Sequence, residues 1–118
     1  IQSQKMKPGN HIYKHMGIHY HVNSLGFRGK EFKPKEKVKP RIICLGGSTT
    51  LGLESADDKT YPAVLERLLN DNELPTEVLN FGFGSKSLRF ITKLLFTEAI
   101  HYQPDIVTIY SKSIYHNQ

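Results

Sequence analysis

The chain has 118 residues, of which 38% are hydrophobic and 23% are charged, and its formal net charge is +5. This length limits it to one domain with the composition of an ordinary globular protein. No apolar run approaches the roughly 20 residues needed to span a bilayer. The single cysteine, Cys44, excludes an intrachain disulfide and a cysteine metal cluster. The chain begins at Ile1 without a signal-peptide pattern, so we expect an upstream segment to have been removed, which leaves the compartment open.

The positive charge is concentrated in the first third of the chain. Residues 1–41 hold ten Lys or Arg and two Glu, a net charge of +8, whereas residues 42–118 hold six Lys or Arg and nine Asp or Glu, a net charge of −3. The excess peaks between Lys30 and Arg41, where two prolines keep the chain extended. Nucleic-acid or anionic-membrane binding is the alternative, but no helix gathers these cations on one face and few aromatics interleave. We therefore predict a basic N-terminal extension and linker over 1–40, a folded domain over 41–118, and no nucleic-acid partner.

Histidines alternate with aromatic and branched side chains over residues 11–22, which favours extended structure. A metal site is the alternative interpretation, because His15 and His19 would share one face of a helix. Gly17 argues against that helix, and no Asp, Glu or Cys lies nearby to complete a ligand set. We interpret the histidines as surface or packing residues and predict neither a metal nor a cofactor. In the turn-rich segment that follows, we expect two apolar side chains to dock on a core, Leu25 and Phe27.

The most informative stretch is an apolar run that ends in two glycines and a serine. Residues 42–45 are apolar on both faces, which is typical of a strand buried in a parallel sheet, and Cys44 is a buried thiol there. Gly46 and Gly47 permit a tight turn, and Ser48 follows at the carboxyl end of the strand. Ligands and reacting groups collect at this edge of open α/β sheets, so Ser48 is a candidate nucleophile. A turn that uses Gly-Gly-Ser for geometry alone explains the motif equally well.

Phosphate binding is a third interpretation of this turn, because backbone N–H groups after a strand can cradle an anion. The Walker pattern requires Lys followed by Ser or Thr after its glycines, and no lysine is present here. The dinucleotide pattern G-x-G-x-x-G is also absent, since the glycine spacing differs. A small anion-binding module is therefore the weakest of the three interpretations.

Two helices and two further strands are predicted after this turn. Thr60 can cap a helix over 61–71 that has proline in its first turn, and Ser85 or Ser87 can cap a second helix over 87–101. Apolar runs predict strands over 77–80 and 106–110, in addition to the strand over 41–45. The alternation of strands and helices predicts an α/β fold with a parallel sheet, in the spatial order second–first–third strand.

Four segments in this order resemble blocks of the SGNH/GDSL hydrolase family of esterases and acyl hydrolases. They are VNSLGFRG (22–29), GGST (46–49), NFGFGS (80–85) and PDIVTIY (104–110). The resemblance implies a three-layer α/β/α, flavodoxin-like fold that is truncated here after the third strand. It also implies Ser48 as nucleophile, the N–H of Ser48 as one oxyanion donor, and the N–H of Gly84 or Ser85 as a second donor.

The last residues depart from the family pattern. The third family block reads Gly-x-Asn, and Lys112 and Ile114 stand at those positions here, so that Asn117 is a displaced candidate for the oxyanion amide. The family's Asp-x-x-His block, which supplies the base, lies further along a longer domain, and none follows Asp105. His116 is the remaining candidate base, although no acidic residue follows to orient it.

We therefore expect a serine esterase or acyl hydrolase that acts on an acyl or acetyl ester, with a carbohydrate ester as one candidate substrate. The alternative is a truncated or degenerate member of the family that acts as a binding module. In that case the strand over 106–110 would form an exposed sheet edge, open to self-association or to a missing C-terminal segment. Either way, we expect this chain alone to be a poor catalyst of marginal stability.

Overall fold

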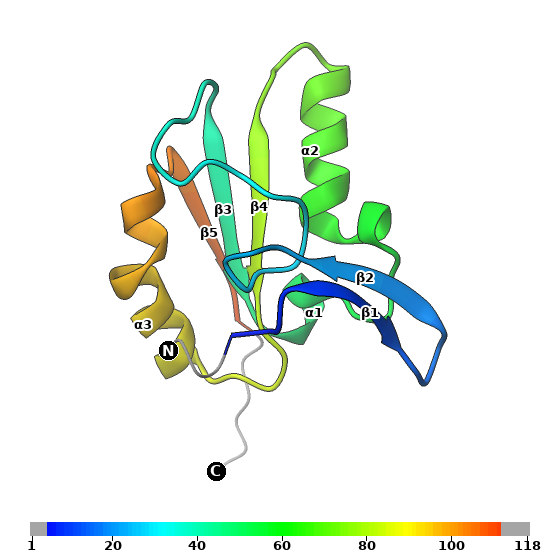
Figure 1. Ribbon diagram of the computed structural model, residues 1–118. Coiled ribbons are helices and arrows are strands. Elements are labelled where there is room, and N and C mark those ends of the chain that lie inside the picture. Colours follow the sequence, from blue (N-terminus) through cyan, green and yellow to red (C-terminus); the bar gives the residue numbers. More distant parts are fainter. Residues whose placement is uncertain (1–4, 112–118) are drawn as a thin grey trace.

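The computed structural model describes residues 5–111 (Figure 1). Two strands, β1 (Gly9–Tyr13) and β2 (Ile18–Val22), form an antiparallel hairpin. Three more form a parallel sheet: β3 (Arg41–Gly46), β4 (Glu77–Gly82) and β5 (Ile106–Tyr110). The spatial order is β4-β3-β5, so the predicted parallel sheet and its order are confirmed.

Strand β3 is central because both of its faces are covered. Of its six residues, only Ile42 is not fully buried. Ile43 lies in register with Leu79 on one side and with Val107 on the other. An apolar run without solvent-facing alternation therefore occupies the middle of the sheet, as expected.

The helices begin where the sequence predicts. Helix α2 (Tyr61–Asp71) is capped by Thr60, whose hydroxyl accepts a hydrogen bond from the Ala63 N–H at 3.4 Å. Helix α3 (Leu88–Thr97) is capped in the same way by Ser87. Three short elements complete the order: α1 (Ser48–Leu51) and the 3₁₀ turns η2 (Asp57–Lys59) and η3 (Ala99–Tyr102).

The prediction of one continuous helix over 87–101 is wrong at its end. The α-helix stops at Thr97, because Glu98 has a φ of −134°, outside the helical region. The chain continues as the 3₁₀ turn η3 and leaves it through Gln103, which is left-handed with a φ of 57°. Apolar spacing persists through η3, so periodicity alone could not locate the break.

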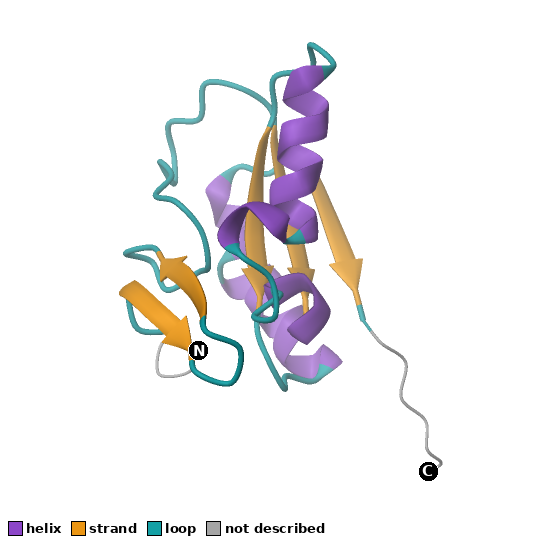
Figure 2. Cartoon of the chain, turned by 90° about the vertical axis from the view of Figure 1, so that its right-hand side faces the viewer, coloured by secondary structure: helices purple, strands orange, loops and turns teal. Residues whose placement is uncertain are grey.

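The segment before β3 belongs to the core. Phe27 is 1% exposed and stacks on Phe81 with ring centroids 3.7 Å apart and planes 2° apart. Leu25 and Phe32 pack against the same cluster, which α3 closes from one face of the sheet. The expected docking of Leu25 and Phe27 is confirmed. In Figure 2 the hairpin lies beside the sheet, and a long loop joins the two.

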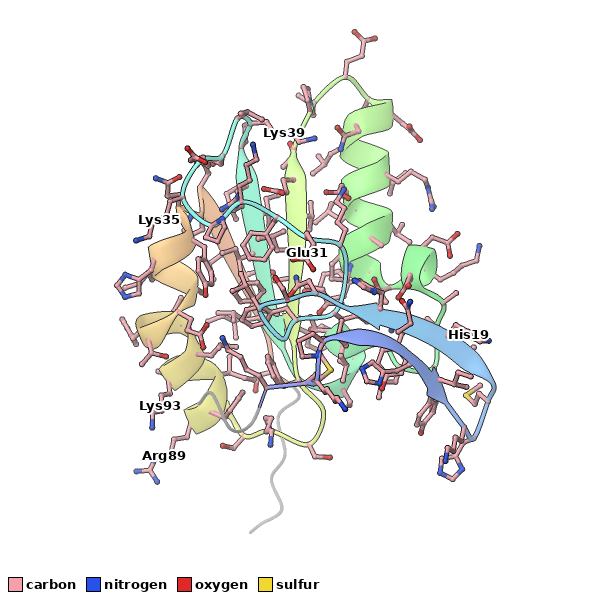
Figure 3. All side chains as sticks on the ribbon, viewed as in Figure 1. His19, Glu31, Lys35, Lys39, Arg89 and Lys93 are labelled. Atoms are coloured by element: carbon pink, nitrogen blue, oxygen red, sulfur yellow. The ribbon has the colours of Figure 1, made fainter. Side chains whose placement is uncertain are left out.

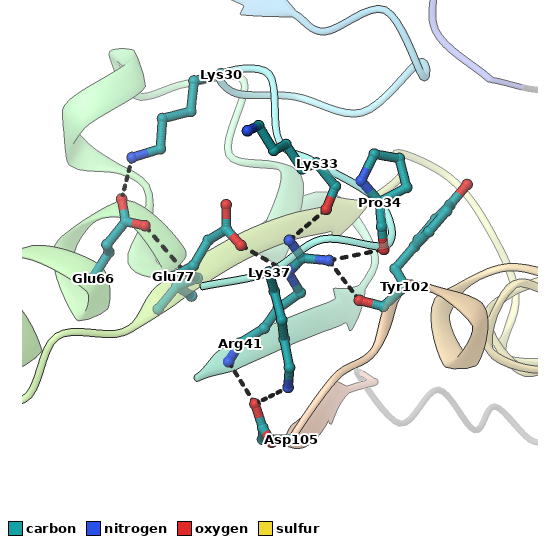
Figure 4. Close-up of polar contacts among 10 residues, drawn as sticks. Lys30, Lys33, Pro34, Lys37, Arg41, Glu66, Glu77, Tyr102 and Asp105 are labelled. Atoms are coloured by element: carbon teal, nitrogen blue, oxygen red, sulfur yellow. Dashed lines mark hydrogen bonds and ion pairs between the residues drawn. The ribbon is translucent and has the colours of Figure 1, made fainter. Parts of the chain in front are cut away.

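Arg41 ties three segments together at the start of the sheet (Figure 4). Its side chain is buried, and its Nε donates to Glu77 Oε1 at 2.7 Å. The guanidinium also donates to three backbone carbonyls, those of Lys33, Pro34 and Tyr102. The basic connector is thereby fastened to β4 and to the segment before β5 at its C-terminal end.

Asp105 completes this cluster and supports the first prediction. Its carboxylate accepts hydrogen bonds from the Lys37 ammonium and from the Arg41 backbone N–H, and these bonds lower its pKa below the usual 3.8. A lowered pKa stabilises the fold above the unfolded-state value, and that contribution disappears as the pH falls through the folded-state value. Asp105→Asn should therefore lower the free energy of unfolding at pH 7, and its difference from wild type should shrink below pH 3.8.

Urea unfolding at pH 7 and at acidic pH measures this effect. Glu36→Gln is the matched control, because Glu36 is exposed and makes no ion pair within residues 5–111. Equal destabilisation by Asp105→Asn at both pH values would contradict the assignment.

Candidate functional site

Ser48 opens the short helix α1 directly after β3. The strand ends at Gly46, and Ser48 is exposed, so its hydroxyl lies at the carboxyl end of the central strand. The carbonyl of Ser48 accepts the Gly52 N–H at 2.8 Å, and Gly52 ends α1 in the left-handed region with a φ of 69°. The serine therefore lies on a closed turn at the edge where this fold class binds its ligands.

The end of β4 lies against this turn. The Phe83 N–H donates to the Gly46 carbonyl at 3.0 Å, and the Phe83 carbonyl is the nearest neighbour of a Cβ built on Gly47, at 3.9 Å. Gly84 and Ser85 follow Phe83 at once, and Ser85 adopts a left-handed φ of 55°. The expected neighbours of Ser48 are thus on the adjoining turn.

Two glycines let α1 rest on the strand ends. A Cβ on Gly46 would lie 2.1 Å from Thr50 Oγ1, and a Cβ on Gly82 would lie 2.3 Å from the Leu51 backbone nitrogen. Backbone cannot yield as a flexible side chain can. The close approach of β4 to α1 therefore requires a residue without a side chain at position 82.

Gly82→Ala should destabilise the chain by about 1–3 kcal/mol, the usual cost of overpacking, because α1 must move away from β4. Gly84→Ala is the matched control, since its added Cβ would meet only Leu51 Cδ2, at an ordinary 3.6 Å. Thermal unfolding of both variants checks this, and equal melting temperatures would contradict the packing argument.

The side chain of Asn80 connects β4 to α1. Its Nδ2 donates to the Thr50 carbonyl at 2.8 Å, and its Oδ1 accepts the Gly82 N–H at 2.9 Å. The side chain is buried, so both of its polar atoms are satisfied inside the protein. These two hydrogen bonds of the Asn80 side chain therefore hold the turn that carries Ser48 in its position relative to β4.

Arg28 holds the same turn from the N-terminal segment, and sequence reasoning did not find this role. Its guanidinium donates to the carbonyls of Leu51 at 3.1 Å, Gly52 at 2.5 Å and Ser55 at 2.7 Å. It also pairs with Asp57 at 3.1 Å, while its own side chain is 2% exposed. The sequence feature that could have indicated this role is the position of Arg28 in the GFRG motif, outside the cluster of cations over 30–41.

The proposed acid–base partners are not placed beside Ser48 by the described residues. His116 and Asn117, as well as Lys112 and Ile114, lie outside them. The five histidines within residues 5–111 lie in the hairpin or in η3: His11, His15, His19, His21 and His101. The site therefore presents a serine hydroxyl and neighbouring backbone N–H groups.

Cys44 and the hairpin histidines have ordinary structural surroundings. Cys44 is fully buried, and burial raises the pKa of its thiol, as the interpretation of a buried thiol expects. His11 stacks on Tyr20 with centroids 5.2 Å apart, and His21 shares a hydrogen bond with Asn10. Across residues 5–111, no three His, Cys, Asp or Glu side chains gather closely enough to hold a metal ion. None of the helices described there is long and apolar enough to cross a membrane.

No protein-family model matches the chain, and no curated protein sequence matches it. The structure alone shows the α/β fold with its three-stranded parallel sheet. The turn around Ser48 is the feature that indicates a function.

Proposed function

We propose that Ser48 is the nucleophile of an SGNH-type serine esterase or acyl hydrolase. The observation that carries the proposal is the exposed hydroxyl at the carboxyl end of the central strand, with the end of β4 against the same turn. Active-site groups of open α/β sheets collect at this edge. Gly46 and Gly47 add no side chains of their own before the serine.

In the proposed reaction, Ser48 Oγ bonds to the ester carbonyl carbon while a general base accepts the hydroxyl proton. The tetrahedral oxyanion is held by the N–H of Ser48 and by that of Gly84 or Ser85, and the alcohol then leaves with a proton from the same base. Water next attacks the acyl-serine and releases the carboxylic acid. His116 is the candidate base within this chain, and Asn117 is the candidate for the amide donor.

The test is covalent labelling together with turnover. The protein expressed from its complete reading frame is incubated with a fluorophosphonate, digested, and examined by mass spectrometry for an adduct on the peptide that contains Ser48. Hydrolysis of short-chain nitrophenyl esters is followed in parallel. An adduct on that peptide and inhibition of turnover support the proposal, whereas ester hydrolysis that survives complete labelling of Ser48 would overturn it.

A second candidate function is a binding module that uses the free edge of β5. Three of its four apolar or aromatic residues are about half exposed: Ile106 at 55%, Ile109 at 48% and Tyr110 at 50%. Unpaired strand edges bind further strands, either from another copy or from another segment. Sedimentation analysis of the wild type and of Ile109→Lys tests this candidate function. If both are monomers, association through the edge of β5 is ruled out.

A further inference from the structure

A cavity of about 510 Å³ lies on the flank of β4, away from the Ser48 turn. It opens between the free edge of β4, the first turns of α2, and the segment over 27–32. Its lining includes six apolar side chains, those of Phe27, Phe32, Pro62, Ala63, Val78 and Phe81, of which Phe32 and Ala63 are the more exposed. The volume is within the range of about 300–1,000 Å³ that is typical of ligand sites.

One backbone N–H and one backbone C=O of β4 face this cavity without a hydrogen-bonding partner among the described residues. The Glu77 N–H donates to the Pro40 carbonyl just before β3, and the Phe83 N–H donates to the Gly46 carbonyl at its end. The N–H groups of the alternate residues 78, 80 and 82 therefore point outward from the sheet. The Val78 N–H is taken by Glu66 Oε2 at 3.0 Å, and the Gly82 N–H by Asn80 Oδ1. Within residues 5–111 the backbone N–H and C=O of Asn80 have no hydrogen-bonding partner, and Asn80 lines the cavity.

This pattern selects a short extended peptide. A residue in a β conformation exposes its N–H and C=O on one side, and two such residues exchange both hydrogen bonds in an antiparallel pair. Pairing cannot extend along β4, because Glu66 and the Asn80 side chain occupy the outward donors on either side of residue 80. One residue of the partner can pair, and its neighbours must fill the apolar cavity.

The charges around the cavity favour an uncharged partner. Three cations and three anions line it: Arg28, Lys30 and Arg67, and Asp57, Asp58 and Glu66. Arg28 pairs with Asp57, and Lys30 pairs with Glu66 at 3.2 Å, which leaves one cation and one anion at the rim. A peptide of either charge would gain one attraction and one repulsion there.

We propose that this cavity binds a short, uncharged, extended peptide segment, which pairs with the backbone of Asn80 and places an apolar side chain against Phe32 and Ala63. This binding does not depend on the proposed ester chemistry, because Ser48 is not among the residues that line the cavity.

Amide NMR of the ¹⁵N-labelled chain tests the proposal directly. The probe is N-acetyl-leucine N′-methylamide, and the expected result is a saturable shift of the Asn80 amide together with those of its neighbours in β4. The matched probe, N-methylated on the leucine nitrogen, lacks one donor and should bind about three- to tenfold more weakly. The aspartate and lysine analogues should both bind more weakly than leucine.

Two variants distinguish binding in the cavity from binding elsewhere on the surface. Ala63→Phe fills the cavity and should abolish the Asn80 shift, whereas Thr92→Phe, on the exposed face of α3, should leave it unchanged. If Ala63→Phe loses the native amide spectrum, the two leucine probes on the unmodified chain decide instead. Equal affinity for both leucine probes, or no Asn80 shift up to the solubility limit, would overturn the proposal.

Discussion

Replacing Ser48 by alanine is expected to lower the hydrolysis of a short-chain ester by about 10⁴-fold or more. Removing a nucleophile leaves only the rate that binding and the oxyanion donors provide, and triad members in serine hydrolases carry effects of this size. The free energy of unfolding should stay within about 0.5 kcal/mol of wild type, because Ser48 is exposed. Loss of activity at constant stability would assign the effect to chemistry.

Thr49→Ala is the matched control for this experiment. Thr49 is the next residue, is also exposed, and carries a hydroxyl on the same turn. It should retain activity close to wild type in the protein expressed from its complete reading frame. Ester turnover that is unchanged in Ser48→Ala, or lost equally in both variants, would contradict the role of Ser48 as nucleophile.

Arg28→Met should destabilise the chain by about 3 kcal/mol, mainly through the lost hydrogen bonds of its buried guanidinium, because the partner Asp57 is 49% exposed and its ion pair adds little. Methionine retains much of the side-chain volume but leaves three carbonyls, those of Leu51, Gly52 and Ser55, without their donor. Buried acceptors that lose a hydrogen bond carry the full cost of desolvation. Urea unfolding measures the change as a lower transition midpoint.

Arg89→Met is the control for Arg28. Arg89 lies on the exposed face of α3 and points away from the protein in Figure 3. Its replacement should change the free energy of unfolding by no more than about 0.5 kcal/mol. If Arg28→Met were equally mild, the network at the Ser48 turn would contribute little to stability.

Elements with strong local signals were predictable from the sequence. The apolar run 42–45 predicted the buried central strand, and Thr60 and Ser87 predicted the starts of α2 and α3, because a cap is a property of a few adjacent residues. The glycine pair placed Ser48 at the carboxyl end of β3. The chemical role of Ser48 stays a prediction, as do the roles of Gly84 and Ser85.

Long-range contacts were not predictable in the same way. Arg41 looks like the last member of a basic stretch and Arg28 like a loop residue, yet each is buried and donates to carbonyls of distant segments. Nothing local to Arg41 indicates Tyr102, and no periodicity indicates that β1 and β2 pair as a hairpin. The end of α3 was missed for the opposite reason, since its apolar spacing continues beyond the helix.

The stack of Phe27 on Phe81 has a consequence for the order in which the chain acquires its structure during synthesis. The ribosome releases the N-terminal segment first, but the ring that covers Phe27 belongs to β4, and the carbonyls that hold Arg28 follow β3. The Phe27 ring therefore stays uncovered until β4 has emerged. The segment that carries Phe27 and Arg28 thus precedes β3 and β4 in the sequence but reaches its final packing only after both have been made.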